Sequence, residues 1–312
     1  MISKFELLYD SQMRTEISLV GGLGNQLFIV AYALFRKHIQ NHEVTLREVK
    51  SGRHNRTHGS FVVKELDGKL GIPEKSGWTV EHLLMKASRF LSAKLRPWKG
   101  SGHNVTYMHE GEMIGRLPSI RPLAIDTFET GYFQNPKFMQ AIQELGFFKE
   151  LRPRNPSDWY LTTVSANYWE GALAVHVRRG DFSGKKGPGA LGLEYYREAI
   201  ELSLAKSDNK TIVVFSDAID EVEELFLGAL PQHHFVFVDP PSDSSAIESL
   251  HLLSRFQSIV ISNSTFSWWA AVTGDSKKSV VAPESWSRSE PQAITLNLES
   301  WTLVRSSWAP QT

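Results

Sequence analysis

A six-residue stretch, His176-Val177-Arg178-Arg179-Gly180-Asp181, contains the residue types that bind phosphate. Arginine presents a planar fork of N–H donors that matches two phosphate oxygens, and a nearby carboxylate can orient that fork. Side chains alternate along a strand, so His176 and Arg178 would project to one side and share a surface. We therefore expect Arg178 and Arg179 to bind an anion, with a structural ion pair to Asp181 as the alternative.

A second segment, Ser262-Asn263-Ser264-Thr265-Phe266-Ser267-Trp268-Trp269, carries hydroxyl groups from a predicted strand into a predicted helix. Asn263, Ser264 or Thr265 could be a helix N-cap, which stabilises a helix by about 0.5 to 2 kcal/mol. The same geometry aims backbone amides and hydroxyls outward, as in a phosphate site. The spacing leaves both interpretations open. The two tryptophans are expected in the core, although an indole could also stack on a sugar or base.

The second half of the chain alternates apolar runs with amphipathic segments, which predicts a doubly wound parallel sheet. The expected strands are 172–177, 211–215, 234–238, 258–261 and 279–282, and the expected helices are 193–205, 219–230, 245–256 and 266–273. Ligands of such sheets bind beyond the carboxyl ends of the strands. The polar residues that follow the strands, Ser216 and Asp217 among them, should therefore converge on one edge.

A third stretch, residues 17–35, contains no charged side chain and is long enough to suggest a membrane span. Its glycines and the amides Asn25 and Gln26 would lie in the hydrocarbon, which argues against that interpretation. A signal peptide fits no better, because no small-residue cleavage site follows. We expect instead a strand over 16–20, a glycine-rich turn and a helix over 27–38.

The glycine-rich turn has two interpretations of its own. It resembles a dinucleotide fingerprint, but the third glycine is absent. Alternatively, Gly22 and Gly24 let a sugar approach the backbone, while Asn25 and Gln26 offer hydrogen bonds to its hydroxyls.

The first half of the chain is otherwise less regular. We expect strands over 43–49 and 124–131 and helices over 61–70 and 135–145, and we leave 78–122 unassigned. Pro153 and Pro156 mark a link between domains. A chain of 312 residues exceeds the usual single core, so we predict Rossmann-like domains over 1–152 and 153–312 that face each other across a cleft.

The composition excludes several classes of function. The 34 basic and 34 acidic residues give zero net charge, so no broad field attracts nucleic acid. The chain has no cysteine, which excludes disulfides, thiolate catalysis and cysteine-based zinc sites. It has no Asp-x-Asp pair, and its histidines lack metal-ligand spacing. We therefore expect no metal and no cofactor, with phosphate charge met by arginine and helix termini.

Five motifs, in order, resemble those of the α-1,2-fucosyltransferase family, glycosyltransferase family 11. They are GGLGNQ at 21–26, GYFQNPKF at 131–138, HVRRGDF at 176–182, FSD at 215–217 and ISNSTFSWWAA at 261–271. The resemblance implies an α/β GT-B architecture of two facing Rossmann-like domains with parallel sheets. It also implies GDP-fucose as the donor, inversion at fucose C1 and no required metal.

The resemblance further implies roles for individual residues. Arg178 would bind the β-phosphate of departing GDP, His176 would meet the nucleotide, and Asp181 would hold the motif together. Asn25 would lie between donor and acceptor. The wider donor set is His176, Arg178, Arg179, Ser216, Asp217, Glu248, Asn263, Ser264, Thr265 and Ser267, of which Ser216, Asp217 and Glu248 would contact ribose or guanine. The acceptor set is Gly22, Gly24, Asn25, Gln26 and His58.

The expected reaction moves fucose to the 2-hydroxyl of a terminal galactose on an oligosaccharide or glycolipid. Asp181 and His176 are both candidates for the base. Two departures from the family pattern are GNQLFIVAYA in place of GNQMFQYA, and Ser60-Phe61 after His58-Gly59, where the family commonly has tyrosine. A catalytically silent nucleotide-sugar or glycan binder is one alternative, and an NAD-dependent oxidoreductase is another. We expect a cytoplasmic location, with peripheral contact at the inner face of the membrane allowed.

Overall fold

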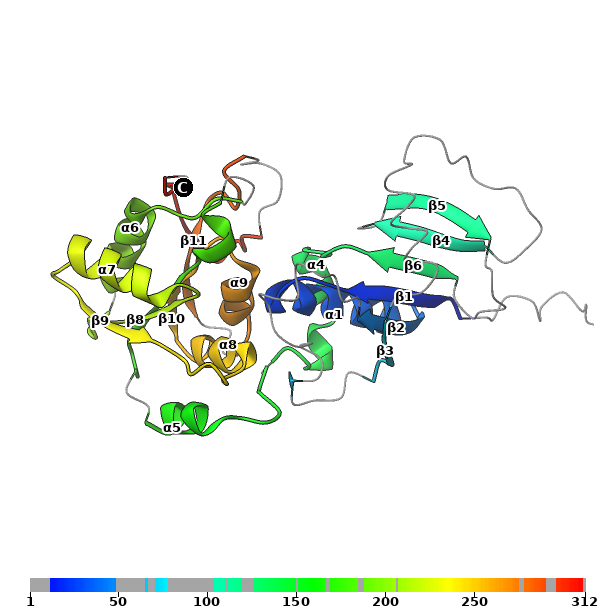
Figure 1. Ribbon diagram of the computed structural model, residues 1–312, viewed down its shortest axis with the longest axis horizontal. Coiled ribbons are helices and arrows are strands. Elements are labelled where there is room, and N and C mark those ends of the chain that lie inside the picture. The colour runs from blue at the N-terminus through cyan, green and yellow to red at the C-terminus, as the bar shows by residue number, and fades with distance from the viewer. Residues whose placement is uncertain are drawn as a thin grey trace, which may run out of the picture. The chain divides into compact units, whose positions relative to one another are not determined.

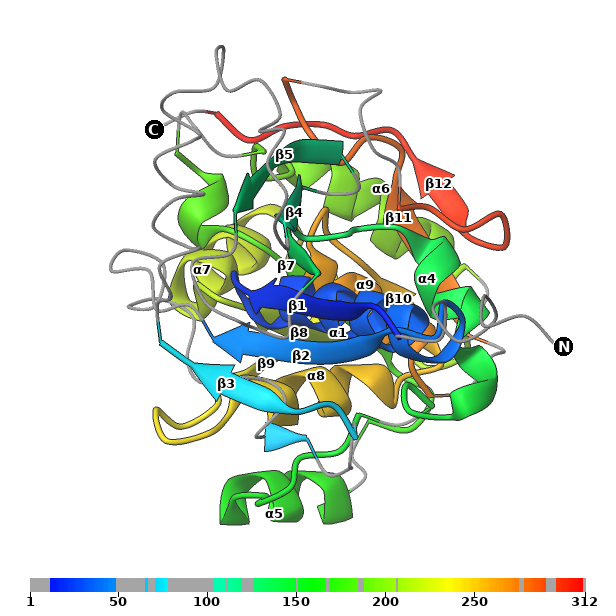
Figure 2. The same ribbon diagram turned by 90° about the vertical axis from the view of Figure 1, so that its right-hand side faces the viewer.

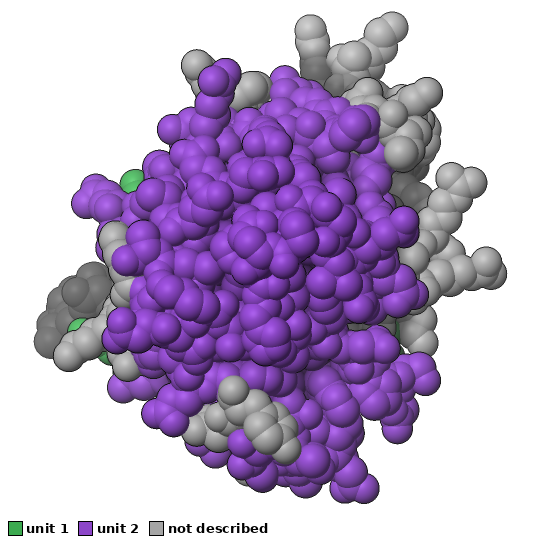
Figure 3. All heavy atoms as spheres, turned by 90° about the vertical axis from the view of Figure 1, so that its left-hand side faces the viewer, with its two compact units in different colours: residues 1–61, 69–145 green, residues 62–68, 146–312 purple. Residues whose placement is uncertain are grey.

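The computed structural model divides the chain into two compact units, residues 1–61 with 69–145 and residues 62–68 with 146–312 (Figure 3). The structure describes residues 12–48, 65–66, 71–77, 104–109, 112–118, 126–149, 151–166, 169–184, 188–205, 207–274, 278–289 and 296–310. Both units are α/β with largely parallel sheets, which confirms the expected fold class. The domain boundary at residue 152 and the cleft between domains stay predictions.

The sheet of the first unit has the strand order β3-β2-β1-β6-β4-β5, and Figure 2 shows its outer strands β3 and β5 at opposite edges. All of its neighbouring strands are parallel except β4 and β5, which are antiparallel. The elements, labelled in Figure 1, are β1 (Arg14–Leu19), α1 (Leu23–His38), β2 (Glu43–Glu48), β3 (Glu74–Ser76), β4 (Asn104–His109), β5 (Glu112–Pro118), β6 (Thr127–Thr130), α4 (Pro136–Ala141) and a 3₁₀ turn (Gln143–Leu145).

Several expectations for this unit need correction. Helix α1 begins at Leu23 instead of residue 27, because Gly21 and Gly22 complete the turn between them. The expected helix over 135–145 is interrupted at Ile142, whose backbone leaves the helical region. Strands β3, β4 and β5 were not predicted. The expected helix over 61–70 lies outside the described residues except for Glu65 and Leu66.

The sheet of the second unit has the order β12-β11-β10-β7-β8-β9, and all its neighbouring strands are parallel. The elements are α5 (Asp158–Ala166), β7 (Leu173–Val177), a 3₁₀ turn (Gly180–Phe182), α6 (Leu193–Leu204), β8 (Thr211–Ser216), α7 (Ile219–Ala229), β9 (His234–Val238), α8 (Ala246–Ser254), β10 (Ser258–Val260), α9 (Thr265–Val272), β11 (Ser279–Pro283) and β12 (Thr302–Val304). Every strand and helix expected here is confirmed, with small shifts at the ends. Helix α5 and the short β12 were missed, because neither carries a long apolar run.

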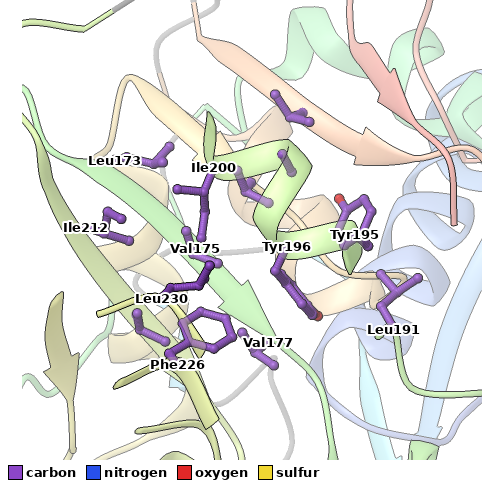
Figure 4. Close-up of a cluster of buried hydrophobic side chains, with 14 of the residues drawn as sticks. Leu173, Val175, Val177, Leu191, Tyr195, Tyr196, Ile200, Ile212, Phe226 and Leu230 are labelled. Carbon is purple, nitrogen blue, oxygen red and sulfur yellow. The ribbon is translucent and has the colours of Figure 1, made fainter. Parts of the chain in front are cut away.

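The core of this unit packs one face of β7 against helices α6 and α7 (Figure 4). Leu173, Val175 and Val177 project to that face and contact a cluster that includes Tyr196 and Phe226. Since side chains alternate along a strand, His176 projects to the opposite face, where its ring stacks on Phe266 of α9. Core packing on one face therefore fixes the direction of the polar residue on the other.

The two tryptophans of α9 are core residues, as expected. Trp268 and Trp269 are fully buried, and their ring centroids lie 5.1 Å apart. The Trp268 indole nitrogen donates to the Leu296 carbonyl oxygen at 2.7 Å. This burial removes the alternative in which an indole stacks on a sugar or base.

Candidate phosphate-binding site

The candidate site lies where the strand order of the second unit reverses. Strands β8 and β9 lie on one side of β7, and β10, β11 and β12 lie on the other. The helices that follow β7 and β10 lie on opposite faces of the sheet, which is the arrangement in which α/β sheets usually bind ligands beyond the carboxyl ends of their strands. The register pairs Val175 with Val260 and Val177 with Ser216. The polar residues after the three strands therefore lie at neighbouring positions, as the sequence predicted.

Arg178, directly after β7, is held by two carboxylates. Its Nη2 donates to Asp181 Oδ1 at 2.8 Å, and its Nη1 lies 3.2 Å from Asp217 Oδ2. The Phe182 ring centroid lies 5.4 Å from its Cζ, within cation–π range. The side chain keeps 18% exposure, and its Nε has no hydrogen-bond partner among the described residues. A guanidinium has five N–H donors, so donors remain for an anion.

Arg179 has different surroundings. Its side chain is buried, with Nη1 3.5 Å from the Leu191 carbonyl oxygen and Nε 3.4 Å from Glu221 Oε1. Its backbone N–H donates to Asp217 Oδ1 at 2.8 Å. The second side chain thus turns into the protein and holds the loop, and its contact with an anion stays a prediction.

His176 supports the corner between β10 and α9. Its Nδ1 lies 2.8 Å from Ser262 Oγ, and its ring centroid lies 5.3 Å from that of Phe266. Burial, with the Arg178 charge adding to it, lowers the pKa of His176 to about 3. The ring is therefore neutral near pH 7 and is a weak proton acceptor, so it is poorly suited to the base role.

The corner itself is built from hydroxyl and amide groups. Ser264 is the N-cap of α9, and its Oγ accepts a hydrogen bond from the Phe266 N–H at 3.3 Å. Ser267 Oγ donates to the Ser264 carbonyl oxygen at 3.1 Å. Asn263 Nδ2 donates to the Gly189 and Trp286 carbonyl oxygens at 2.9 and 3.1 Å.

The start of α9 is suited to an anion. The helix has no acidic residue in its first turn, so no carboxylate offsets the positive end of its dipole. The capping role expected of this segment is confirmed for Ser264, and phosphate binding there stays a prediction. Thr265 is half-buried at the first helical position.

The residues expected to contact ribose or guanine already have partners within the protein. Ser216 Oγ accepts from the Ala218 N–H at 3.1 Å. Asp217 holds both arginines, as described above. Glu248 closes a capping box on α8, accepting from the Ser245 N–H at 2.9 Å, and also accepts from the Ser157 N–H at 2.5 Å. A nucleotide contact by these residues stays a prediction, and the structure adds supporting roles that the sequence did not reveal.

The first unit has its own strand-to-helix corner, where β1 leads into α1. Gly21 has φ +83°, and a Cβ there would lie 2.8 Å from Tyr132 Cε1. Asn25 Oδ1 accepts from Gln134 Nε2 at 2.8 Å, so the motifs at 21–26 and 131–138 meet. The residue before Gln134, Phe133, has φ +50°, an uncommon conformation for a residue with a side chain.

Gln26 does not point outward as expected. Its Nε2 donates to the Gly21 carbonyl oxygen at 2.8 Å, and its side chain is buried. It therefore fixes the turn from inside, and its contact with acceptor hydroxyls stays a prediction. Gly22 is the N-cap of α1, with no side-chain cap, and Gly24 is buried in the first turn. His58 lies outside the described residues.

Metal binding and membrane insertion find no support in the part of the chain that the structure describes. No group of three or more His, Asp or Glu residues in that part is placed to hold a metal ion. No helix within the described residues has the length and hydropathy needed to cross a bilayer.

Known proteins with similar sequences are glycosyltransferases. The O-antigen biosynthesis glycosyltransferase WbnK of Escherichia coli is 32% identical over 133 residues, which cover 41% of this chain and 43% of that protein. An alpha-1,2-colitosyltransferase of Escherichia coli is 23% identical over 302 residues, 92% of this chain and 97% of that one. The match to WbnK thus spans less than half of that relative.

Two solved structures show a weaker likeness. NodZ alpha-1,6-fucosyltransferase soaked with GDP-fucose aligns over 83% of this chain and 92% of its own, with 14% identity and a TM-score of 0.41. POFUT1 in complex with GDP-fucose aligns over 86% and 97%, with 12% identity and a TM-score of 0.49.

The family assignment rests on the sequence model described as Glycosyl transferase family 11, which matches residues 124–305. That range includes β6, the loop with Gln134, and the whole candidate site from His176 to Ser267. The match covers more than half of the chain, and it confirms the resemblance drawn from the motifs: the chain belongs to glycosyl transferase family 11.

Proposed function

We propose that the chain transfers fucose from GDP-fucose to the 2-hydroxyl of a terminal galactose on an oligosaccharide or glycolipid, with inversion at fucose C1. The observation that carries the proposal is Arg178, which follows β7, the neighbour of β10, and is held by two carboxylates with an Nε that has no partner among the described residues. A sugar nucleotide needs such a site for its diphosphate, because negative charge grows there as the sugar leaves.

Different residues of the site would bind different parts of the diphosphate and stabilise the leaving group. Arg178 would donate to the β-phosphate, and the first-turn amides of α9 would meet the pyrophosphate together with Ser264 and Thr265. Preorganised donors of this kind are worth about 2.7 to 4 kcal/mol each in acyl-transfer enzymes. The C1–O bond to the phosphate would break as the acceptor hydroxyl attacks from the opposite face, losing its proton to a base. Asp181, 59% exposed and hydrogen-bonded to Arg178, stays one candidate for that base.

The acceptor would be bound by the β1–α1 corner of the first unit. Asn25 is positioned there by Gln134, and Gly22 leaves the backbone open. An Asn25→Ala variant should bind GDP as the unmodified protein does and lose affinity for the acceptor. A loss of GDP affinity in that variant would assign this corner to the donor.

The donor sugar has a second candidate. The relative that aligns over 92% of this chain is named as an alpha-1,2-colitosyltransferase, so a colitosyl donor is the alternative to a fucosyl donor. Parallel assays with GDP-fucose and GDP-colitose, read by mass spectrometry of the acceptor, distinguish the two. A product from GDP-colitose alone would replace fucose in the proposal and leave the phosphate site unchanged.

The central experiment replaces Arg178. Arg178→Ala and Arg178→Lys should both abolish transfer, because lysine cannot reproduce the planar fork. Arg255→Ala, an exposed arginine at the end of α8, is the matched control and should transfer normally. Near-normal turnover by a folded Arg178→Ala protein would contradict the proposal.

Two further measurements separate the rival functions. GDP binding by calorimetry without transfer to any galactoside would identify a silent nucleotide-sugar binder. Micromolar NADH binding, followed by fluorescence, would favour the oxidoreductase. The proposal includes independence from metal ions, so transfer should continue in excess EDTA.

A further inference from the structure

Asp217 uses both oxygens of its carboxylate to hold the loop that follows β7. Its Oδ1 accepts from the Arg179 backbone N–H at 2.8 Å, and its Oδ2 lies 3.2 Å from Arg178 Nη1. Asp217 follows β8, the strand that neighbours β7. One side chain from the next strand thus fixes both the backbone and the guanidinium at the candidate site.

Gly180 lies directly beside this carboxylate. A Cβ at position 180 would lie 2.4 Å from Asp217 Oδ2, closer than real Cβ contacts allow. The φ of Gly180 lies outside the left-handed region, so its backbone alone does not require glycine. The space that an added methyl group would take is the space that Asp217 occupies.

The two carboxylates around Arg178 are not equivalent. The side chain of Asp181 is 59% exposed, whereas that of Asp217 is 25% exposed. Water and salt screen an exposed pair strongly, and such pairs stabilise little. Asp217 also holds a backbone N–H, which ties it to the loop, so it is the better placed of the two to restrict the arginine side chain.

We propose that Asp217 is a positioning residue that sets the Arg178 guanidinium for the diphosphate, and that Gly180 is required to leave room for it. This role differs from the contact with ribose or guanine expected from the sequence. It rests on the proposed function of Arg178 as a phosphate ligand. An arginine held in place before binding loses less side-chain entropy when the anion arrives, which strengthens binding.

The first test compares two nucleotides that differ by one phosphate. Asp217→Asn retains an oxygen for the Arg179 N–H and loses the charge that holds Arg178. Ordering one long side chain when the anion arrives weakens binding, so the Kd for GDP should rise about 2- to 13-fold. The Kd for GMP, which lacks the β-phosphate, should change little. Equal losses for GDP and GMP in calorimetry would overturn the proposal in favour of direct contact with the nucleoside.

The second test uses Gly180 as an independent probe of the same carboxylate. Gly180→Ala should weaken GDP binding in the unmodified protein but add no further loss in an Asp217→Ala background, where the oxygen it would displace is gone. Gly184→Ala is the matched control in the same loop, because its Cβ would meet only the Asp181 carbonyl oxygen, at 3.9 Å, among the described residues. Equal losses from Gly180→Ala in both backgrounds would overturn the proposed coupling.

The Arg178→Ala protein distinguishes the two proposals. If it binds GDP normally, the phosphate role of Arg178 fails and the positioning role fails with it. If it loses GDP binding while Asp217→Asn and Gly180→Ala retain it, only the positioning role fails. In an Arg178→Ala background, Asp217→Asn should have no further effect on GDP affinity. Circular dichroism of each variant at the assay temperature confirms that the folded protein is being measured.

Discussion

Two corners lead from a strand into a helix, β1–α1 in the first unit and β10–α9 in the second. They make the same turn with different residue types. The β1–α1 corner uses glycine: Gly21 adopts φ +83° and Gly22 begins the helix without a side-chain cap. The β10–α9 corner uses hydroxyls: Ser264 caps the helix with its own side chain. Both sit where the strand order of their sheet reverses.

The difference between the corners follows from what lies behind each. In the first, Tyr132 packs so close to Gly21 that no side chain fits. In the second, His176 and Ser262 form a hydrogen bond at the end of β10, and Ser264 caps the helix that follows. A glycine corner exposes backbone to a ligand, and a hydroxyl corner adds polar groups that suit an anion. The contrast agrees with a sugar at the first and a phosphate at the second.

The largest expected effect is on the glycine corner. Gly21→Ala forces a side chain into the left-handed region, at about 1 to 2 kcal/mol. It also places a methyl group against Tyr132, where overpacking costs typically about 1 to 3 kcal/mol more. Urea denaturation should show a loss of stability equal to the sum of these two costs. Gly77→Ala separates the backbone cost from the steric cost, because Gly77 has φ +96° and its Cβ would meet no described residue within 4 Å. Equal losses at the two positions would refute the steric part.

The next effect is on the support of the hydroxyl corner. His176→Gln should lower the free energy of unfolding at pH 7 by about 1 to 3 kcal/mol, the cost of a disturbed buried hydrogen bond. Urea denaturation at pH 7 measures this loss beside the unmodified protein.

The pH dependence of stability identifies the part of this loss that is due to the titration of His176. The pKa of His176 is about 3 in the folded protein, below its unfolded value, so its contribution to stability is present above about pH 6.5 and is lost as the pH falls towards 3. Glutamine does not titrate, so the gap between the two proteins should narrow on acidification. Burial lowers the pKa of His42 as well, but that residue is common to both proteins. A gap that stays constant between pH 7 and pH 4 would contradict this assignment.

A smaller effect separates the cap of α9 from its phosphate site. Ser264→Ala should cost about 0.5 to 2 kcal/mol of stability, the usual value of an N-cap. Ser264→Asp keeps a capping oxygen and so should keep the stability, but its charge should repel a diphosphate. Thermal melts of both variants measure stability, and GDP titrations measure the affinity for the diphosphate. Undiminished GDP binding by Ser264→Asp would place the phosphate elsewhere.

The smallest expected effect is a change in stability at a glycine that lies outside both corners. It is the control for the Gly21 variant. Gly228 lies in α7, where an added Cβ would meet none of the described residues within 4 Å and the backbone has no left-handed φ. Gly228→Ala should therefore stabilise the protein by about 0.4 to 1 kcal/mol, because alanine restricts the unfolded chain. A loss of stability there would mean that the costs expected at Gly21 are not specific to its corner.

Local patterns in the sequence were enough for most of the second unit. Continuous apolar runs predicted β7 to β11, and the hydroxyl segment predicted the start of α9. The first unit was harder, since β4 and β5 carry mixed residues and β3 has only three exposed ones. A short or mixed strand is stable only through its neighbours, so its own residues carry little signal.

What the sequence determined by itself was most elements of the second unit and the polar residues at their ends, because periodicity and capping are local properties of the chain. The expected phosphate chemistry after β7 and β10 is of this kind. Only the tertiary structure decided that Asp217 holds Arg178, that Arg179 turns inward and that Gln26 closes its own turn. These contacts depend on which strands are neighbours and on the space between side chains. Both are determined by residues that are distant in the sequence.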